Sequence, residues 1–300
     1  MSLVVLNNIN LANYTSWLIG GAAEYFCTPK DETELQEAFI FSKNNNLEIT
    51  ILGSGSNVLI SDLGIQGLVI CLKYFNQVIS RVETKNGQNK ILIEADAGSA
   101  KSELLKIFLK NKLSPALFLA GIPGQVGGGV VMNAGVAEDF FPREFMEIVD
   151  EIDILNLNGK IQTYKKSELK ISYRHTTGWQ PGVIFKVRMS WPIDVDETVL
   201  AKVKTANLLR LSKQPLDWPS CGSVFKNPEG FKAAQLIDQC GLKGFRIGDA
   251  QVSEKHANFI INLGKATATD TWNVIQHVRS TVLSVKNVSL TTEVVRLGHW

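Results

Sequence analysis

The chain has 300 residues, of which 45% are hydrophobic and 20% are charged, which is enough apolar material for more than one folded core. Its 31 basic and 29 acidic residues nearly cancel and are interspersed, which disfavours nucleic acid and membrane surfaces as partners. We therefore expect a globular protein whose partners are small molecules.

The first part of the chain alternates predicted helices and strands. Asp31 followed by Glu34 predicts a capped helix, after which residues 47–52 predict a strand that ends at a glycine-rich turn. This alternation favours an α/β fold. Further strands and one helix are expected over residues 67–72, 91–97 and 99–110.

The pattern changes in the middle of the chain, where β structure dominates. Asn158-Gly159 predicts a hairpin turn, and apolar residues alternate with polar or small ones over 183–191, as in a half-buried strand. Residues 192–196 break that strand, and we place a domain boundary near residue 194. The remaining predicted elements are helices over 197–211, 231–240 and 270–285 and strands over 258–262 and 290–298.

The cysteines and histidines form no recognisable cluster. The four cysteines show no CxxC spacing, which fits reduced thiols in a cytoplasmic protein better than disulfides. The four histidines show no HExxH pattern, so a metal site is not expected. No basic stretch precedes an apolar one at the start, and no apolar run approaches membrane-spanning length, so secretion and membrane insertion are disfavoured.

Two glycine-rich turns are the main candidates for a binding site. Glycine lets successive backbone N–H groups point inward and lets a ligand approach closely, which makes anion-binding concavities, and serine adds hydroxyl donors. Taken alone, either segment could instead be an ordinary tight turn at the end of a sheet that binds no ligand. Neither turn fits GxGxxG before a helix or a P-loop. The candidate residues are Gly53, Ser54, Gly55, Ser56, Asn57 and Val58, and Gly121, Ile122, Pro123, Gly124, Gly127 and Gly128.

Three further segments carry groups that suit chemistry. Arg174 follows Tyr173, and a guanidinium binds carboxylates and phosphates, although a surface arginine stacked on tyrosine is the simpler alternative. Ser223 lies in a proline-bounded segment that lacks the GxSxG frame of a nucleophile elbow, and an ordinary surface turn is its alternative. Glu293 is predicted on a mostly apolar face of the strand 290–298, beside Thr291, Val295 and Leu297, where a carboxylate needs a partner or a purpose.

Together these segments resemble the flavin-dependent UDP-N-acetylenolpyruvoylglucosamine reductase family over nearly the whole chain, in the shorter subgroup that lacks an extra tyrosine-bearing loop. The chain departs from the usual pattern over residues 136–142, where small residues are common. The motifs that carry the resemblance are the turns 53–57 and 121–124, Asn133-Ala-Gly135, Ser172-Tyr-Arg174, and the segments 219–228, 241–244, 252–259 and 290–294.

The resemblance implies a fold in two domains. Residues 1–194 would form an FAD-binding domain of the vanillyl-alcohol-oxidase type, made of two α/β subdomains that divide near residue 72, and residues 195–300 a C-terminal α/β substrate-binding domain. The two glycine turns, together with Asn133, Ala134 and Gly135, would hold FAD.

The resemblance also implies a reaction. NADPH would reduce FAD, and the reduced flavin would deliver hydride to UDP-N-acetylglucosamine enolpyruvate, giving the peptidoglycan precursor UDP-N-acetylmuramate. Arg174 and Glu293 match positions that stabilise the enolate, and Ser223 matches the proton donor. The matching substrate-binding positions are Tyr173, Lys226 and Asn227. No obligate protein partner is implied.

Two other functions are compatible with the glycine turns. An FAD-dependent oxidase of the same cofactor-binding class would keep the turns but would not need Arg174, Ser223 and Glu293 together. A nonenzymatic protein that binds a nucleotide sugar or flavin would leave these three residues without a purpose.

Overall fold

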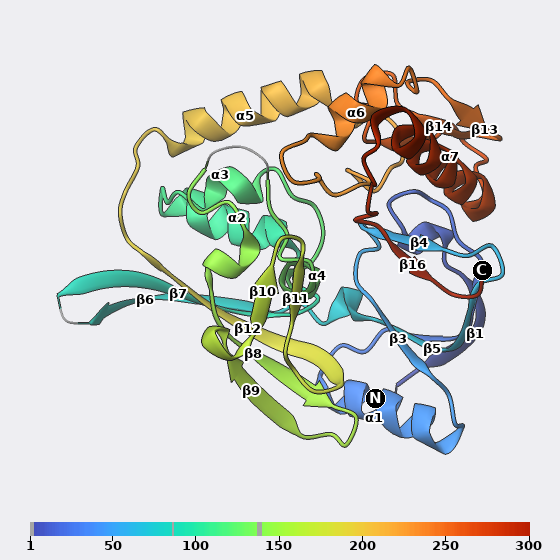
Figure 1. Ribbon diagram of the computed structural model, residues 1–300. Coiled ribbons are helices and arrows are strands. Elements are labelled where there is room, and N and C mark those ends of the chain that lie inside the picture. The colour runs from blue at the N-terminus through green and yellow to red at the C-terminus, as the bar shows by residue number, and fades with distance from the viewer. Residues whose placement is uncertain (1–2, 86, 137–139) are drawn as a thin grey trace.

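The N-terminal sheet is built around parallel strands joined by a helix (Figure 1). The computed structural model describes residues 3–85, 87–136 and 140–300. The strand order is β1-β2-β5-β3, in which β5 is parallel to both of its neighbours and β1 is antiparallel to β2. The strands are β1 (Val5–Asn10), β2 (Ala22–Cys27), β3 (Ile49–Leu52) and β5 (Ile65–Cys71).

Helix α1 (Glu32–Asn44) begins where the sequence predicts it. The Asp31 carboxylate accepts a hydrogen bond from the Glu34 backbone N–H at 2.9 Å, which satisfies one of the unpaired donors of the first turn. Leu35 and Phe39 point from one face of the helix into a large apolar core. The capping residue and the apolar spacing therefore fix the start of the helix and its buried face.

The second sheet is antiparallel throughout, with the order β6-β7-β12-β8-β9. Gly159 adopts a φ of +75° in the turn between β8 and β9, which confirms the predicted hairpin. Helices α2 (Lys101–Lys110), α3 (Ala116–Leu119) and α4 (Val126–Val131) share a core with this sheet. The strands are β6 (Val78–Lys85), β7 (Gln88–Asp96), β8 (Val149–Asn156), β9 (Ile161–Lys165) and β12 (Gly182–Pro192).

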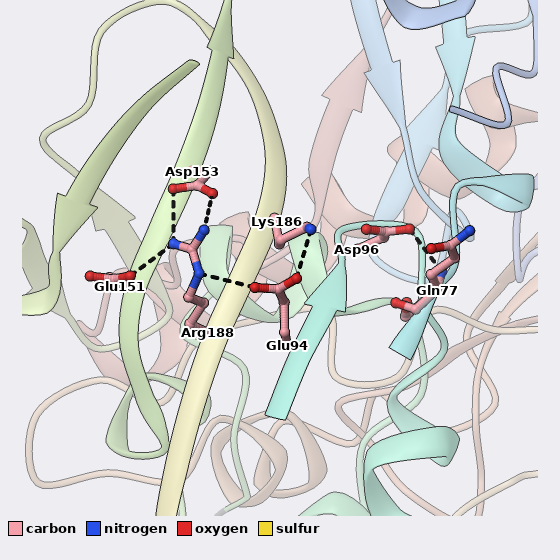
Figure 2. A network of polar contacts seen from close by, with 8 residues as sticks. Gln77, Glu94, Asp96, Glu151, Asp153, Lys186 and Arg188 are labelled. Atoms are coloured by element: carbon pink, nitrogen blue, oxygen red, sulfur yellow. Dashed lines mark hydrogen bonds and ion pairs between the residues drawn. The ribbon is translucent and has the colours of Figure 1, made fainter. Parts of the chain in front are cut away.

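The polar residues of β12 join its neighbours through ion pairs (Figure 2). Arg188 contacts Glu94 on β7 at 3.1 Å, and on β8 it contacts Glu151 at 2.8 Å and Asp153 at 2.6 Å. Lys186 contacts Glu94 at 2.7 Å, and this hydrogen bond lowers the pKa of Glu94. Apart from the buried Asp153, these charges are partly exposed, so each of the pairs with Glu94 and Glu151 contributes at most about 1 kcal/mol, and the shared network mainly fixes the register of three strands.

The C-terminal part combines three helices with a small antiparallel sheet. Its core includes Ile275 and Val282 of the last helix, and Trp17 and Leu59 from the N-terminal part pack into the same core. The order of the sheet is β13-β14-β15. The elements are α5 (Val199–Lys213), α6 (Ala233–Gln239), β13 (Arg246–Ile247), β14 (Ala250–Val252), β15 (Ile260–Asn262) and α7 (Ala268–Lys286).

The two parts of the chain are interlocked. The Trp17 indole N–H donates to the Ile260 carbonyl at 2.7 Å, and the Asn262 amide donates to the Trp17 carbonyl at 2.9 Å. Val199 and Val203 of α5 belong to the core of the N-terminal part. The domain boundary near residue 194 stays a prediction, because each of the two cores contains side chains from the other side of that boundary.

The last strand differs from its prediction over 290–298. Strand β16 covers only Val295–Leu297 and pairs in parallel with β4 (Val58–Ile60), while Thr292 makes an isolated bridge to Phe225. The chain bends at Val294, so Glu293 and Val295 do not share one continuous face as expected. The other predicted helices and strands are confirmed to within a few residues at their ends. In the described ranges, no helix has the length and hydropathy needed to cross a membrane.

The N-terminal cap of helix α7, formed by Thr267 and Asp270, is extended by Asp62 from the other part of the chain. One oxygen of Asp62 accepts from the Ala268 N–H at 2.8 Å, and the other accepts from the N–H of Thr269 at 2.9 Å and from its hydroxyl at 2.7 Å. A carboxylate at a helix N-terminus satisfies unpaired donors and complements the helix dipole.

We expect Asp62→Ala to lower the free energy of unfolding by about 1 to 2 kcal/mol, the usual range for a lost N-terminal cap. Urea denaturation followed by circular dichroism measures the change. Asp194→Ala, at an exposed position just before α5, is the matched control and should leave the midpoint unchanged. Equal midpoints for Asp62→Ala and the control would contradict the capping role.

Candidate active site

A cavity of about 1160 Å³ lies where the N-terminal and C-terminal parts meet. Both glycine turns line it, as do Arg174, Ser223 and Glu293. The predicted binding residues that line it are Gly53, Ser54, Gly55, Ser56, Asn57, Val58, Gly121, Ile122, Pro123, Gly127, Gly128, Ala134, Gly135, Tyr173 and Asn227. The fold thus brings together segments that lie far apart in the sequence.

The two glycine turns meet at Gly124. The first turn joins β3 to β4, and the second joins α3 to α4. Gly124 has a φ of +100°, and a Cβ there would lie 2.8 Å from the Ser56 Oγ and 3.4 Å from the Ser54 Oγ. Only glycine tolerates this backbone conformation and this approach. The serine hydroxyls and the second turn therefore form one continuous concave wall.

The far end of the first turn holds the segment that carries Glu293. The Asn57 side-chain amide donates to the Glu293 carbonyl at 3.0 Å, and the Val295 N–H donates to the Asn57 carbonyl at 3.1 Å. These bonds continue directly into the parallel pairing of β4 with β16. Asn57 thus links the predicted cofactor wall to the predicted catalytic carboxyl.

Asn133 lies behind the cavity wall. Its side chain is almost fully buried, donates to Glu144 at 2.8 Å and to the Ser172 carbonyl at 3.2 Å, and accepts from the Met146 N–H at 3.1 Å. It therefore ties the end of α4 to the strand β10 (Lys170–Ser172), which pairs with β11 (His175–Thr177). A contact between Asn133 and FAD stays a prediction.

Arg174 sits in the turn between β10 and β11 with a φ of +56°, a conformation uncommon for a residue other than glycine. Its Nη2 donates to the Gly135 carbonyl at 2.8 Å, and its guanidinium lies over the Tyr173 ring at 4.7 Å. Its Nε lies 3.3 Å from Glu293 and its Nη1 lies 3.6 Å from Glu144. The side chain is only 9% exposed, and its Nη1 is buried at the cavity wall without a hydrogen-bond partner among the described residues.

Glu293 is held in an environment that favours its neutral form. Its side chain is 18% exposed, and burial raises the pKa of the carboxyl, while Arg174 and Lys226 act in the opposite direction. Its backbone N–H donates to the Val224 carbonyl at 2.8 Å, next to Ser223. The acid and the hydroxyl therefore come from two adjacent backbone segments.

The segment around Ser223 is held by Asn258, a residue that the sequence interpretation did not single out. The Asn258 side chain accepts from the Phe225 N–H at 2.9 Å and donates to the Phe225 carbonyl at 2.8 Å. The Val224 N–H donates to the Asn258 carbonyl at 2.8 Å. Three bonds thus fix the backbone beside Ser223, whose side chain lies at the cavity wall.

The two remaining predicted substrate residues differ in position. Asn227 lines the cavity and accepts from the Ala233 N–H at the start of α6 at 3.0 Å. Lys226 lies next to the cavity wall, and its Nζ is 3.4 Å from the Arg174 carbonyl. In the predicted departure from the family pattern, residues 137–139 lie outside the described residues, while Val136 and Phe140 line the cavity.

Comparison with known proteins defines the class of protein first. The "FAD binding domain" family matches residues 23–165, and the family "UDP-N-acetylenolpyruvoylglucosamine reductase, C-terminal domain" matches residues 214–297. The protein is therefore an FAD-dependent oxidoreductase with an α/β fold, which confirms the predicted fold class and cofactor.

The relatives give the family. The UDP-N-acetylenolpyruvoylglucosamine reductase of Clostridium novyi is 38% identical over 296 residues, covering 98% of this chain and 92% of the relative. That of Pediococcus pentosaceus is 39% identical over 300 residues, covering 98% and 95%. The crystal structure of the Thermus caldophilus enzyme superposes with a TM-score of 0.77 at 29% identity, covering 98% of each chain. The chain belongs to the UDP-N-acetylenolpyruvoylglucosamine reductase family.

The residues at the cavity fit FAD. The concave wall at Gly124 has no room for a Cβ, and two serine hydroxyls border it, as a bound phosphate group requires. The Gln125 Oε1 is buried beside Gly53 and has no hydrogen-bond partner among the described residues. An unsatisfied polar atom in such a wall is a position at which a ligand completes the hydrogen bonding.

Proposed function

We propose that the protein reduces UDP-N-acetylglucosamine enolpyruvate to UDP-N-acetylmuramate with NADPH as the reductant and FAD as the cofactor. The catalytic roles proposed below rest on the positions of three side chains. Arg174, Ser223 and Glu293 come from three separate segments and meet at one cavity, whose wall is formed by the two glycine turns. Neither a general FAD-dependent oxidase nor a simple binding protein needs this arrangement.

The reaction needs a hydride source, a charge stabiliser and a proton donor. FAD, when bound, supplies the hydride. Arg174 is held at the wall by the Gly135 carbonyl and by two carboxyl groups, and its guanidinium is preorganised to bind the substrate carboxylate as negative charge develops on it. Preorganised charge in a site that excludes water stabilises an enolate more strongly than solvent does.

Glu293 complements Arg174 by acting in its protonated form. Burial favours the neutral acid, which can donate a hydrogen bond to the enolate, whereas an ionised carboxylate would repel it. Ser223 then gives its hydroxyl proton to the carbon that has gained negative charge. The three bonds of Asn258 around Ser223 keep the hydroxyl in place for this transfer.

Substrate binding is assigned to Tyr173, Lys226 and Asn227. Tyr173 and Asn227 line the cavity. The Lys226 ammonium group donates to the backbone carbonyl of Arg174 and so supports the turn that carries Arg174. We further propose that the protein acts in the cytoplasm on small-molecule substrates and needs no protein partner. These substrates are precursors of peptidoglycan, so the enzyme would serve cell-wall synthesis.

We expect purified protein to be yellow, to lose its flavin absorbance when NADPH is added without oxygen, and to regain it when UDP-N-acetylglucosamine enolpyruvate follows. UDP-N-acetylglucosamine, which lacks the enolpyruvyl group, is the control and should not restore the colour. Visible absorbance near the flavin maximum records each step. Protein that is loaded with FAD and bleached by NADPH but not reoxidised by the enolpyruvyl compound would remove the assignment.

We expect Ser223→Ala to keep reduction by NADPH unchanged and to slow reoxidation by the enolpyruvyl substrate on the order of a hundredfold or more, because only the second step needs a proton donor. Stopped-flow absorbance separates the two steps. Ser223→Cys retains a weak donor and should recover part of the rate. Ser212→Ala, on the exposed side of α5, should behave as wild type. Equal losses in both steps would mean that Ser223 only supports the fold.

We expect the rate of reoxidation to fall as pH rises through the raised pKa of Glu293, because the acid loses the proton with which it stabilises the enolate. Glu293→Gln cannot titrate and should lack this decline. The control Glu229→Gln, at an exposed position, should retain it. Single-turnover rates across pH measure the effect.

The same titration should appear in stability. A carboxyl whose folded pKa is raised binds its proton more tightly in the folded state, so the free energy of unfolding falls as pH rises from the ordinary value towards the folded one. Glu293→Gln should flatten this part of the stability curve. If Glu293→Gln kept the same decline of the reoxidation rate with pH as the wild type, a group other than Glu293 would be responsible for that decline.

A further inference from the structure

Lys101 is a buried cation that the family assignment does not use. It is the first residue of α2, it is only 4% exposed, and it lines the cavity. Its backbone N–H donates to the Gly124 carbonyl at 3.0 Å, and the preceding Ala100 makes an isolated bridge to Gln125. These two contacts fix the start of α2 directly against the second glycine turn.

The ammonium group has no anionic partner within the described part of the chain. No ion pair or hydrogen bond joins its Nζ to any described residue, and the Nζ lies 5.9 Å from the centroid of the Phe145 ring. Burying an unpaired charge is costly. The position is also at a helix N-terminus, where the dipole favours an anion and disfavours a lysine, and Ala100 provides no capping side chain. An anion bound at the cavity wall would offset both the cost of burying the unpaired charge and the unfavourable interaction of the lysine with the helix dipole.

The stem of Lys101 reaches the same point as the two serine hydroxyls. A Cβ on Gly124 would lie 3.5 Å from the Lys101 Cε, 2.8 Å from the Ser56 Oγ and 3.4 Å from the Ser54 Oγ. A cation and two hydroxyl donors around a glycine turn form the donor set that phosphate oxygens prefer. Neutral parts of a ligand would gain nothing from the charge.

We propose that Lys101 binds the diphosphate of FAD and supplies its positive counter-charge. This inference rests on the proposed function for the presence of FAD, and it adds a residue that none of the glycine turns contains. The diphosphate is a strong acid and stays ionised throughout the neutral pH range. The charge of the pair therefore depends on Lys101.

The lysine should change its protonation when FAD binds. Burial alone lowers the pKa of Lys101 to about 7, and no titratable group on α2, on the second glycine turn or beside Phe145 contributes among the described residues. A bound diphosphate raises this pKa again by charge attraction. FAD binding above pH 7 should therefore take up a proton, and the affinity for FAD should fall as pH rises.

The test uses protein freed of FAD and titrated with FAD from pH 6 to 8.5. We expect the wild type to lose affinity above pH 7 and to take up a proton, as measured by calorimetry in two buffers that differ in ionisation enthalpy. Lys101→Met should bind FAD at least about tenfold more weakly at pH 6.5, as expected for a lost charged partner. Its affinity should not depend on pH in this range, and its binding should take up no proton. Lys110→Met, at the exposed end of the same helix, is the matched control and should match the wild type.

A misfolded variant is separated from a binding defect by denaturation. Without FAD, Lys101→Met should be at least as stable in urea as the wild type, because an unpaired buried charge has been removed. Added FAD should then stabilise the variant less than it stabilises the wild type. A variant that is less stable without FAD, but binds FAD as tightly as the wild type, would overturn the proposal.

Two further readouts identify the group that the lysine contacts. Riboflavin has no phosphate, so its affinity should be the same for the wild type and Lys101→Met, and the reduction potential of bound FAD should also be the same. A shifted potential, or an equal loss of riboflavin affinity, would place Lys101 at the flavin ring and overturn the proposal. Wild-type protein that binds FAD but is not reoxidised by the enolpyruvyl substrate would instead refute the proposed function.

Discussion

The site depends on the return of the C-terminal segment onto the first glycine turn. Strand β16 pairs in parallel with β4, and Asn57 holds the Glu293 carbonyl with its side chain. This contact fixes the carboxyl of Glu293 against the guanidinium of Arg174, and the adjacent backbone bridge brings the Ser223 segment alongside. Without this pairing the concave wall would remain, but the groups assigned to charge stabilisation and proton transfer would not face it.

The net charge of the ionisable side chains around Arg174 decides whether the site can accept an anionic substrate. Arg174 lies between Glu144 and Glu293, so with both carboxyls ionised these three side chains would carry a net negative charge, and the nearby Lys226 would only balance it. Protonation of Glu293, which burial favours, leaves a neutral arginine–glutamate pair and a free hydrogen-bond donor. Lys101, beside the second glycine turn, is a cation that has no anionic partner among the described residues. Both features are better suited to bound anions than to an isolated protein.

Local sequence signals predicted the elements that depend on local physics. Asp31 caps α1, Gly159 turns the β8–β9 hairpin, and the alternation over 183–191 gives β12. The prediction for residues 290–298 was wrong in part, because β16 ends where its partner β4 ends, and the sequence does not show which strand will be the partner. Lys101 was missed although it lies three residues before the buried Leu104 and therefore on the apolar face of its helix.

The sequence alone determined those helices and strands that carry a cap, a turn signal or a clear periodicity, the glycine turns and, through the order of its motifs, the family to which the chain belongs. Only the tertiary structure decided that Asn133 supports the wall from behind, that Asn258 holds the Ser223 segment, and that Lys101 is buried with no anionic partner in the described ranges. The physical reason is the range of the interactions. Caps, turns and periodicity act between residues close in the chain, whereas the burial and pairing of a charge depend on segments that meet only after folding.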